Sequence, residues 1–204
     1  MANVKSLLKP KNCSVCGKKL RGVWNSKLIG GAVICRECTS LMRVSSLQIP
    51  YLTLSEAEEL VARGRKNKEN LESFLITKEV ESCDYLFRLD EDHSDWYITS
   101  THKTLNPQVY RLCDLKSYRL YENGTLVREK QRGYATVEYD SPEYTEYARL
   151  YSYRFLFDID GLDEPLEIEM VNDNAKDAHP GSRLYNAYLS DAKQWTDFFE
   201  NILN

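Results

Sequence analysis

Two Cys-x-x-Cys pairs near the N-terminus carry the strongest chemical signal in this chain of 204 residues: Cys13/Cys16 and Cys35/Cys38. Eighteen residues separate the two pairs, a spacing typical of four-cysteine zinc modules. Zn2+ prefers tetrahedral coordination and takes thiolates at about 2.3 Å, so two short loops can supply all of its ligands. Four thiolates leave no open position for water or substrate. The pattern therefore predicts one structural Zn2+ ion, bound by Cys13, Cys16, Cys35 and Cys38.

Other uses of such cysteines are an iron–sulfur cluster, a redox-active pair and a disulfide framework. Disulfides need an oxidising compartment, but residues 1–10 contain no apolar run typical of a signal peptide and no 18-residue apolar stretch occurs later, so we expect a cytoplasmic protein. A thioredoxin-like pair would be single and embedded in a βαβ unit. Zinc is preferred to iron because nothing else near the thiolates indicates electron transfer, although ligand type alone does not select the metal. The isolated Cys83 and Cys113 have apolar neighbours and are expected to be buried free thiols.

The sequence around the four cysteines predicts a small module built around the metal. Residues 23–24 and 32–34 are expected to form two short strands, and residues 36–43 a short helix that opens at the second pair. Gly17 follows the first pair, where a tight turn favours a residue without Cβ. Knuckle, hairpin and helix around one ion describe a treble-clef-like zinc ribbon over residues 1–48. Because so small a module buries little apolar surface, the metal must stabilise it.

Charge is distributed unevenly along the chain, whose formal charge is −4. Residues 1–50 carry nine Lys or Arg and a single acid, Glu37, whereas residues 51–204 carry 18 basic and 30 acidic side chains. The basic segment could contact nucleic acid or an acidic protein surface. It could also dock on the acidic remainder of its own chain, or its lysines could simply offset the anionic tetrathiolate. Trp24 is the only aromatic residue of the ribbon, which disfavours the stacking platform of single-strand binders.

Residues 49–73 are predicted to form a helical connector. Pro50 breaks the first module, and Ser55 with Glu58 matches a capping box ahead of apolar residues at helical spacing. Gly64 is expected to end or weaken that helix. The apolar side of the helix should pack on one of the two flanking domains.

From Phe74 onward the apolar period changes from helical to strand-like. About seven strands are expected, with Asn123-Gly124 as a strong signal for a tight hairpin. One amphipathic helix follows; it starts at residues 180–182 and its apolar stripe ends at Ile202. The expected strands cover residues 84–90, 96–99, 109–113, 117–121, 125–128, 149–158 and 166–171.

The predicted fold class is α+β in three parts. The four-cysteine zinc ribbon (residues 1–48) is followed by the helical connector (49–73). Residues 74–204 are predicted to form a seven-stranded, partly open barrel capped by the C-terminal helix, which is the pleckstrin-homology (PH) architecture. This last assignment follows from the order of elements, since no motif identifies it.

Two segments surround the cysteine pairs: Cys13-Ser14-Val15-Cys16-Gly17-Lys18-Lys19-Leu20 and Ile34-Cys35-Arg36-Glu37-Cys38. In these segments the chain resembles a family of bacterial proteins of unknown function that open with a four-cysteine zinc ribbon. Several members continue with a stretch like Phe74-Leu75-Ile76-Thr77, then strands and a terminal helix of the PH-like kind. The resemblance is specific over residues 10–43 and rests on strand order beyond them. It implies a zinc-binding cytoplasmic protein that shares the four metal ligands and no catalytic residue.

No catalytic constellation stands out in the sequence. The histidines His93, His102 and His179 are scattered, and the motifs of phosphate loops, nucleophile elbows and zinc proteases are missing. Phosphoinositide binding is not expected, because the turn over residues 90–95 is acidic and would repel phosphate. An exposed sheet edge could instead dock a peptide strand.

These observations predict a non-enzymatic, zinc-binding adaptor or accessory protein of the bacterial cytoplasm that binds a protein partner. The alternative is a nucleic-acid-associated protein that uses the basic ribbon.

Overall fold

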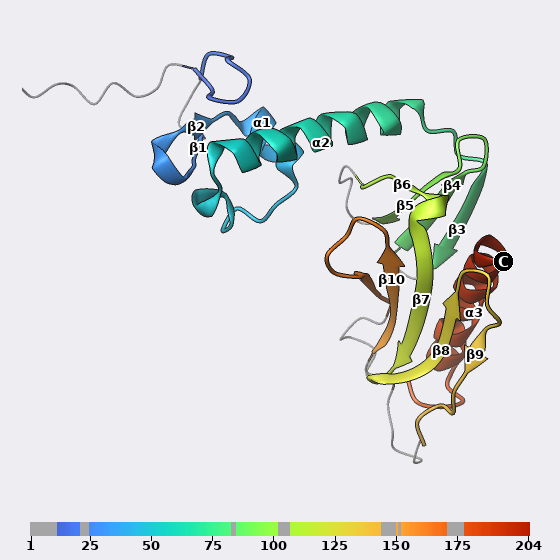
Figure 1. Ribbon diagram of the computed structural model, residues 1–204. Coiled ribbons are helices and arrows are strands. Elements are labelled where there is room, and N and C mark those ends of the chain that lie inside the picture. The colour runs from blue at the N-terminus through green and yellow to red at the C-terminus, as the bar shows by residue number, and fades with distance from the viewer. Residues whose placement is uncertain are drawn as a thin grey trace, which may run out of the picture. The chain divides into compact units, whose positions relative to one another are not determined.

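A computed structural model divides the chain between Ser73 and Phe74 into two compact units (Figure 1). The structure describes residues 12–20, 25–82, 85–101, 107–143, 150, 152–170 and 178–204. The N-terminal unit (residues 1–73) holds the four cysteines and two α-helices, and the C-terminal unit (residues 74–204) holds two antiparallel sheets and the last helix. The predicted α+β class is therefore confirmed. None of the described helices is long and apolar enough to cross a membrane.

The N-terminal unit begins with a two-stranded hairpin and a short helix. Strand β1 (Ser26–Lys27) pairs antiparallel with β2 (Val33–Ile34), and helix α1 (Arg36–Met42) follows at once. Arg43 adopts a left-handed conformation (φ 57°) that ends α1. The predicted second strand and helix are confirmed, whereas the predicted strand at residues 23–24 lies outside the described residues.

Helix α2 (Leu54–Ser73) starts at a capping box that lies two residues earlier than predicted. The Thr53 hydroxyl accepts a hydrogen bond from the Glu56 backbone N–H at 3.3 Å, and the Glu56 carboxylate accepts one from the Thr53 N–H at 2.7 Å. Two otherwise unpaired donors at the helix start are thus satisfied reciprocally. The prediction that Ser55 and Glu58 form this box was wrong.

Gly64 neither ends nor interrupts α2, which runs on for nine more residues to Ser73. A Cβ atom at Gly64 would lie 2.1 Å from the backbone oxygen of Leu41 in α1. The residue is therefore required for close approach of the two helices. Through this contact Ala57 and Val61 of α2 join the buried core that contains Cys13 and Cys38.

The Gly64→Ala variant tests this contact, because helix propensity alone would raise the stability of the unit whereas close helix packing would lower it. In an exposed helix the change would stabilise by about 1 kcal/mol, but here the steric clash is expected to destabilise the N-terminal unit by about 1–3 kcal/mol. Hydrogen–deuterium exchange of α1 and α2 amides measures the effect. The control is Arg63→Ala, an exposed position on α2. Unchanged or slower exchange in Gly64→Ala would contradict the close helix packing.

The C-terminal unit contains a four-stranded and a five-stranded antiparallel sheet. The four-stranded sheet has the order β3-β4-β5-β6, and the five-stranded sheet the order β11-β10-β7-β8-β9. At the β7–β8 hairpin, Asn123 (φ 48°) and Gly124 (φ 80°) form the predicted tight turn. The strand bounds are β3 (Lys78–Ser82), β4 (Tyr85–Asp90), β5 (Asp95–Ser100), β6 (Tyr110–Arg111), β7 (Leu115–Glu122), β8 (Thr125–Gln131), β9 (Val137–Glu138), β10 (Tyr153–Ile159) and β11 (Leu166–Glu169).

The strands differ from the prediction in number and closure. Strands β3 and β9 were not expected: β3 is a mostly exposed, charged edge strand and β9 has only two residues, so neither shows the alternating pattern that predicts a strand. The described strands lie in two sheets and do not close into a barrel. The prediction of antiparallel strands followed by a helix that packs on them is confirmed.

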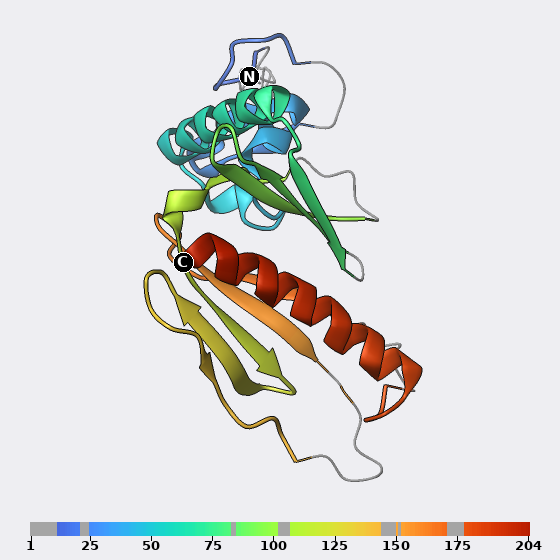
Figure 2. The same ribbon diagram turned by 90° about the vertical axis from the view of Figure 1, so that its right-hand side faces the viewer.

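Helix α3 (Arg183–Leu203) lies along the five-stranded sheet (Figure 2). The Ser182 hydroxyl caps its start by accepting a hydrogen bond from the Tyr185 N–H at 3.1 Å, as the predicted helix start requires. Phe199 is buried between the two sheets, with ring centroids 4.5 Å from Phe157 of β10 and 4.9 Å from Phe87 of β4. A single helix face thus joins both sheets into one aromatic core.

The acidic turn between β4 and β5 is held by the buried carboxylate of Asp90. It accepts hydrogen bonds from the Leu75 N–H at 2.7 Å and the His93 N–H at 3.0 Å, and it lies 2.7 Å from His93 Nδ1. Burial opposes ionisation of Asp90, but these hydrogen bonds hold its pKa below the usual range. The hydrogen bond to Asp90, helped by the charges of Asp90, Asp92 and Asp95, raises the pKa of His93.

This pair predicts a pH-dependent contribution to the stability of the C-terminal unit. Because the pKa of His93 is raised, its ion pair stabilises the folded unit fully below about pH 6.5, and this stabilisation is lost as the pH rises through the raised pKa. The pKa of Asp90 is lowered, so its contribution to stability is present above about pH 3.9 and is lost as the pH falls through the lowered pKa. His93→Gln should therefore destabilise the unit more at pH 5.5 than at pH 9.

Urea unfolding measures the change in the free energy of unfolding caused by His93→Gln at the two pH values. It is followed by tryptophan fluorescence in a Trp24→Phe background, where only Trp96 and Trp195 remain. His179→Gln serves as the control. The account of the turn is wrong if the His93→Gln effect is the same at both pH values.

Candidate metal centre

The four cysteines form one cluster in the N-terminal unit. Their Sγ atoms all lie within 4.8 Å of one another. Cys13 Sγ lies 3.9 Å from Cys38 Sγ, and Cys16 Sγ lies 3.7 Å from Cys35 Sγ. Four sulfurs placed tetrahedrally at about 2.3 Å from one ion would be about 3.8 Å apart, whereas a disulfide needs about 2.05 Å. The cluster therefore has the dimensions of a tetrahedral thiolate site and could hold a metal ion such as Zn2+.

The first pair is shaped by a tight turn. Gly17 N–H donates to the Cys13 carbonyl at 2.9 Å, and Cys13 N–H donates to the Lys18 carbonyl at 2.8 Å. Gly17 adopts φ 71°, a conformation that costs little only without a Cβ atom. Ser14 N–H donates to the Val33 carbonyl at 2.8 Å, which attaches this turn to β2. These hydrogen bonds hold the turn that carries the first two sulfurs.

The second pair is positioned by the start of α1. Cys35 is extended (φ −76°, ψ 160°) immediately before the helix, and the buried Cys38 lies in its first turn. Cys35 N–H donates to Cys13 Sγ at 3.3 Å. This hydrogen bond links the two pairs directly and favours a thiolate at Cys13.

The electrostatics of the cluster favour a bound cation. Burial opposes ionisation of Cys13, but backbone N–H groups of Cys16, Cys35 and Val15 lower its pKa to about 6. Burial and the neighbouring thiols of Cys16 and Cys35 raise the pKa of Cys38, and burial also raises that of Cys16. One thiolate therefore forms readily, but four negative sulfurs at these distances need a positive ion among them.

An ion pair that was not predicted from the sequence joins the first turn to helix α1. Lys18 Nζ lies 2.7 Å from a Glu37 carboxylate oxygen, and both side chains are largely exposed, so the pair contributes little to stability. The available signal was the position of opposite charges beside the two pairs: Lys18 follows Cys16 by two residues and Glu37 lies inside the second pair.

Among the described residues, the other candidate cysteine and histidine side chains do not join this cluster. Cys113 is exposed, so the prediction of a buried thiol was wrong; it lies in a short 3-10 turn with its Sγ 3.4 Å from Asp114. His93 belongs to the acidic turn and His179 lies near the start of α3. Predictions for Cys83, His102 and Trp24 fall outside the described residues.

Comparisons of the chain with protein-family models, with curated proteins and with solved structures gave no match. The resemblance to bacterial zinc-ribbon proteins therefore stays a prediction.

Metal removal should unfold the N-terminal unit and leave the C-terminal unit folded. Cys13 and Cys38 lie inside the small core of the N-terminal unit, and without a cation their thiolates would repel each other. Chelation, or Cys38→Ser, is expected to abolish amide protection in α1 and α2 while protection in β7 and β10 persists, as measured by hydrogen–deuterium exchange. Cys113→Ser is the matched control. Full protection of α1 after complete metal removal would contradict a structural role.

Proposed function

We propose that the chain binds one structural Zn2+ ion through Cys13, Cys16, Cys35 and Cys38. The observation that carries the proposal is the spacing of the sulfurs, 3.7 and 3.9 Å in two pairs, which matches the edge of a tetrahedral thiolate site. Zn2+ suits such a site better than harder cations, which prefer oxygen ligands. Once four thiolates bind the ion, no coordination position is left for a water molecule that the metal could activate. The metal would therefore stabilise a surface and perform no catalysis.

The function that fits such a site is a non-enzymatic adaptor or accessory role in the bacterial cytoplasm, with a protein as partner. A reducing compartment keeps the four thiols available as ligands. The proposal also includes a PH-like architecture for the C-terminal unit. It is supported by antiparallel sheets and a C-terminal helix packed on them.

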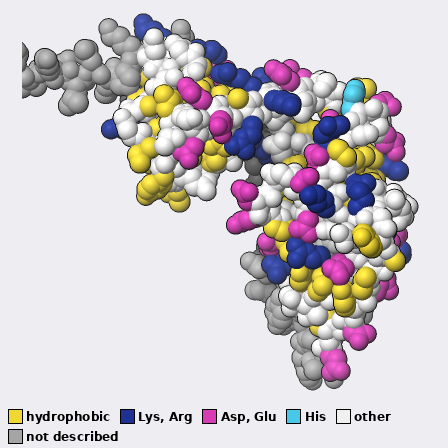
Figure 3. Space-filling model, in the orientation of Figure 1, with side chains coloured by type: hydrophobic (Ala, Val, Ile, Leu, Met, Phe, Trp, Pro, Cys, Tyr) yellow, Lys and Arg dark blue, Asp and Glu magenta, His cyan; other side chains and the backbone are white. Residues whose placement is uncertain are grey.

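An apolar surface on the N-terminal unit supports a protein partner. Ile29, Leu47 and Tyr51 are 55%, 80% and 78% exposed. We call these three residues the apolar loop surface; Ile29 N–H donates to the Leu52 carbonyl at 3.1 Å, so its two loops are joined. Hydrophobic side chains also gather at the lower edge of this unit in Figure 3. Exposed clusters of this kind mark interaction sites.

Nucleic-acid binding is less well supported than a protein partner. Helix α2 packs in the same unit as the basic ribbon and carries five glutamates against four basic residues. These glutamates reduce the positive field that attracts phosphate. The alternative predicts retardation of DNA or RNA in a gel shift at low salt that weakens steeply as salt is added.

A partner-capture experiment tests the adaptor role. The intact chain, Leu47→Ser/Tyr51→Ser and Cys38→Ser are used as baits in lysate, with Tyr134→Ser as a control for an exposed aromatic residue of the C-terminal unit. One stoichiometric protein should bind the intact chain and the control, and should be lost from both other variants. Retention of that protein by Leu47→Ser/Tyr51→Ser would contradict docking on the apolar loop surface, and its retention by Cys38→Ser would contradict dependence on the metal.

A further inference from the structure

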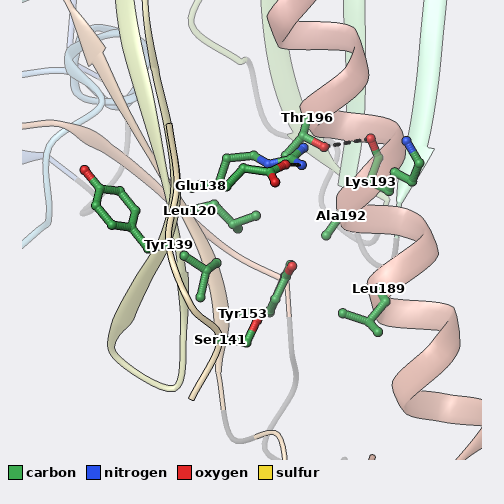
Figure 4. A pocket seen from close by; sticks show the side chains of 11 residues that line it. Leu120, Glu138, Tyr139, Ser141, Tyr153, Leu189, Ala192, Lys193 and Thr196 are labelled. Carbon is green, nitrogen blue, oxygen red and sulfur yellow. Dashed lines mark hydrogen bonds and ion pairs between the residues drawn. The ribbon is translucent and has the colours of Figure 1, made fainter. Parts of the chain in front are cut away.

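A pocket of about 300 Å³ lies between the five-stranded sheet and helix α3 in the C-terminal unit (Figure 4). Its walls come from β7, β8, β9, β10 and α3, so it is built on regular elements of the aromatic core. The apolar lining residues are Leu120, Val127, Leu189 and Ala192. This volume lies at the lower end of the range for small-molecule sites.

The hydroxyl of Tyr153 points into this pocket (Figure 4). Only 6% of the residue is exposed, and no described residue forms a hydrogen bond with the hydroxyl. Burial raises its pKa, so the group stays protonated and can donate. The hydroxyl is therefore a hydrogen-bond donor that faces the pocket, and it can donate to a ligand that carries an acceptor.

The charged side chains around the pocket already have partners. Arg128 pairs with Glu138 and also with Glu200, at 3.4 Å. Lys193 pairs with Asp197 at 2.8 Å. Because each cation is balanced by a neighbouring carboxylate, the described lining of the pocket offers no unpaired charge to a charged ligand.

We propose that this pocket binds a small uncharged organic molecule that has an apolar body and a carbonyl-type acceptor for the Tyr153 hydroxyl. The apolar body would contact Leu120, Val127 and Leu189. This activity goes beyond the proposed adaptor role and uses no residue of the metal centre. It can therefore be tested independently of that role.

The test is an NMR titration of the full-length, metal-loaded chain with three probes of similar size. Benzamide carries an apolar ring and a neutral acceptor, ethylbenzene lacks the acceptor, and benzoate adds a negative charge. Benzamide is expected to shift the amide signals of pocket residues saturably and to bind more tightly than benzoate. No saturable shift with benzamide would overturn the proposal, and tighter binding of benzoate would overturn the uncharged class of ligand.

Two variants locate the binding. Tyr153→Phe removes only the hydroxyl, which has no described partner, so the fold should be retained; benzamide affinity should fall about five- to tenfold while ethylbenzene affinity is unchanged. Leu189→Trp fills the pocket from a partly exposed position and should abolish binding of both. Tyr134→Phe, outside this pocket, should leave both affinities unchanged, and thermal unfolding checks the fold of each variant. Benzamide affinity that survives Tyr153→Phe or Leu189→Trp would overturn the assignment.

Discussion

Four sulfurs confined to within 4.8 Å of one another are the constraint on which the N-terminal unit depends. A tight turn and the start of α1 bring them together, and the backbone hydrogen bonds of these segments favour a negative charge at Cys13. Four such charges cannot coexist without a cation. The unit has eight buried hydrophobic residues in its described core, and two of them are the cysteines Cys13 and Cys38. Loss of the ion would therefore remove both an electrostatic balance and part of the core.

The two units are stabilised by different interactions. The N-terminal unit combines a candidate metal centre with one close helix contact, in which Gly64 allows α2 to approach Leu41. The C-terminal unit depends on a large aromatic core instead, with Phe199 in contact with rings from both sheets. A core of that kind needs no metal. This difference explains why the units should respond differently to chelation.

Local patterns in the sequence predicted the features that depend on local geometry. Cysteine spacing indicated the cluster because a Cys-x-x-Cys loop fixes two sulfurs by itself, and the Asn123-Gly124 turn and the Ser182 cap are equally local. Gly64 was misjudged because its role comes from Leu41, a residue distant in sequence. Strand β3 was missed because an exposed edge strand does not need alternating apolar residues. The orientation of Tyr153 could not be predicted, since a core tyrosine and a tyrosine that lines a pocket have the same sequence pattern.

X-ray absorption at the metal edge of the full-length chain, purified without added metal, tests the central claim most directly. The account predicts one zinc per chain, surrounded by four sulfur neighbours at about 2.3 Å and by no nitrogen or oxygen ligand. It also predicts that Cys13→Ser/Cys35→Ser loses the metal. A zinc site with an oxygen or nitrogen neighbour, an iron signal, or a chain that contains no metal would contradict a closed, structural four-thiolate centre.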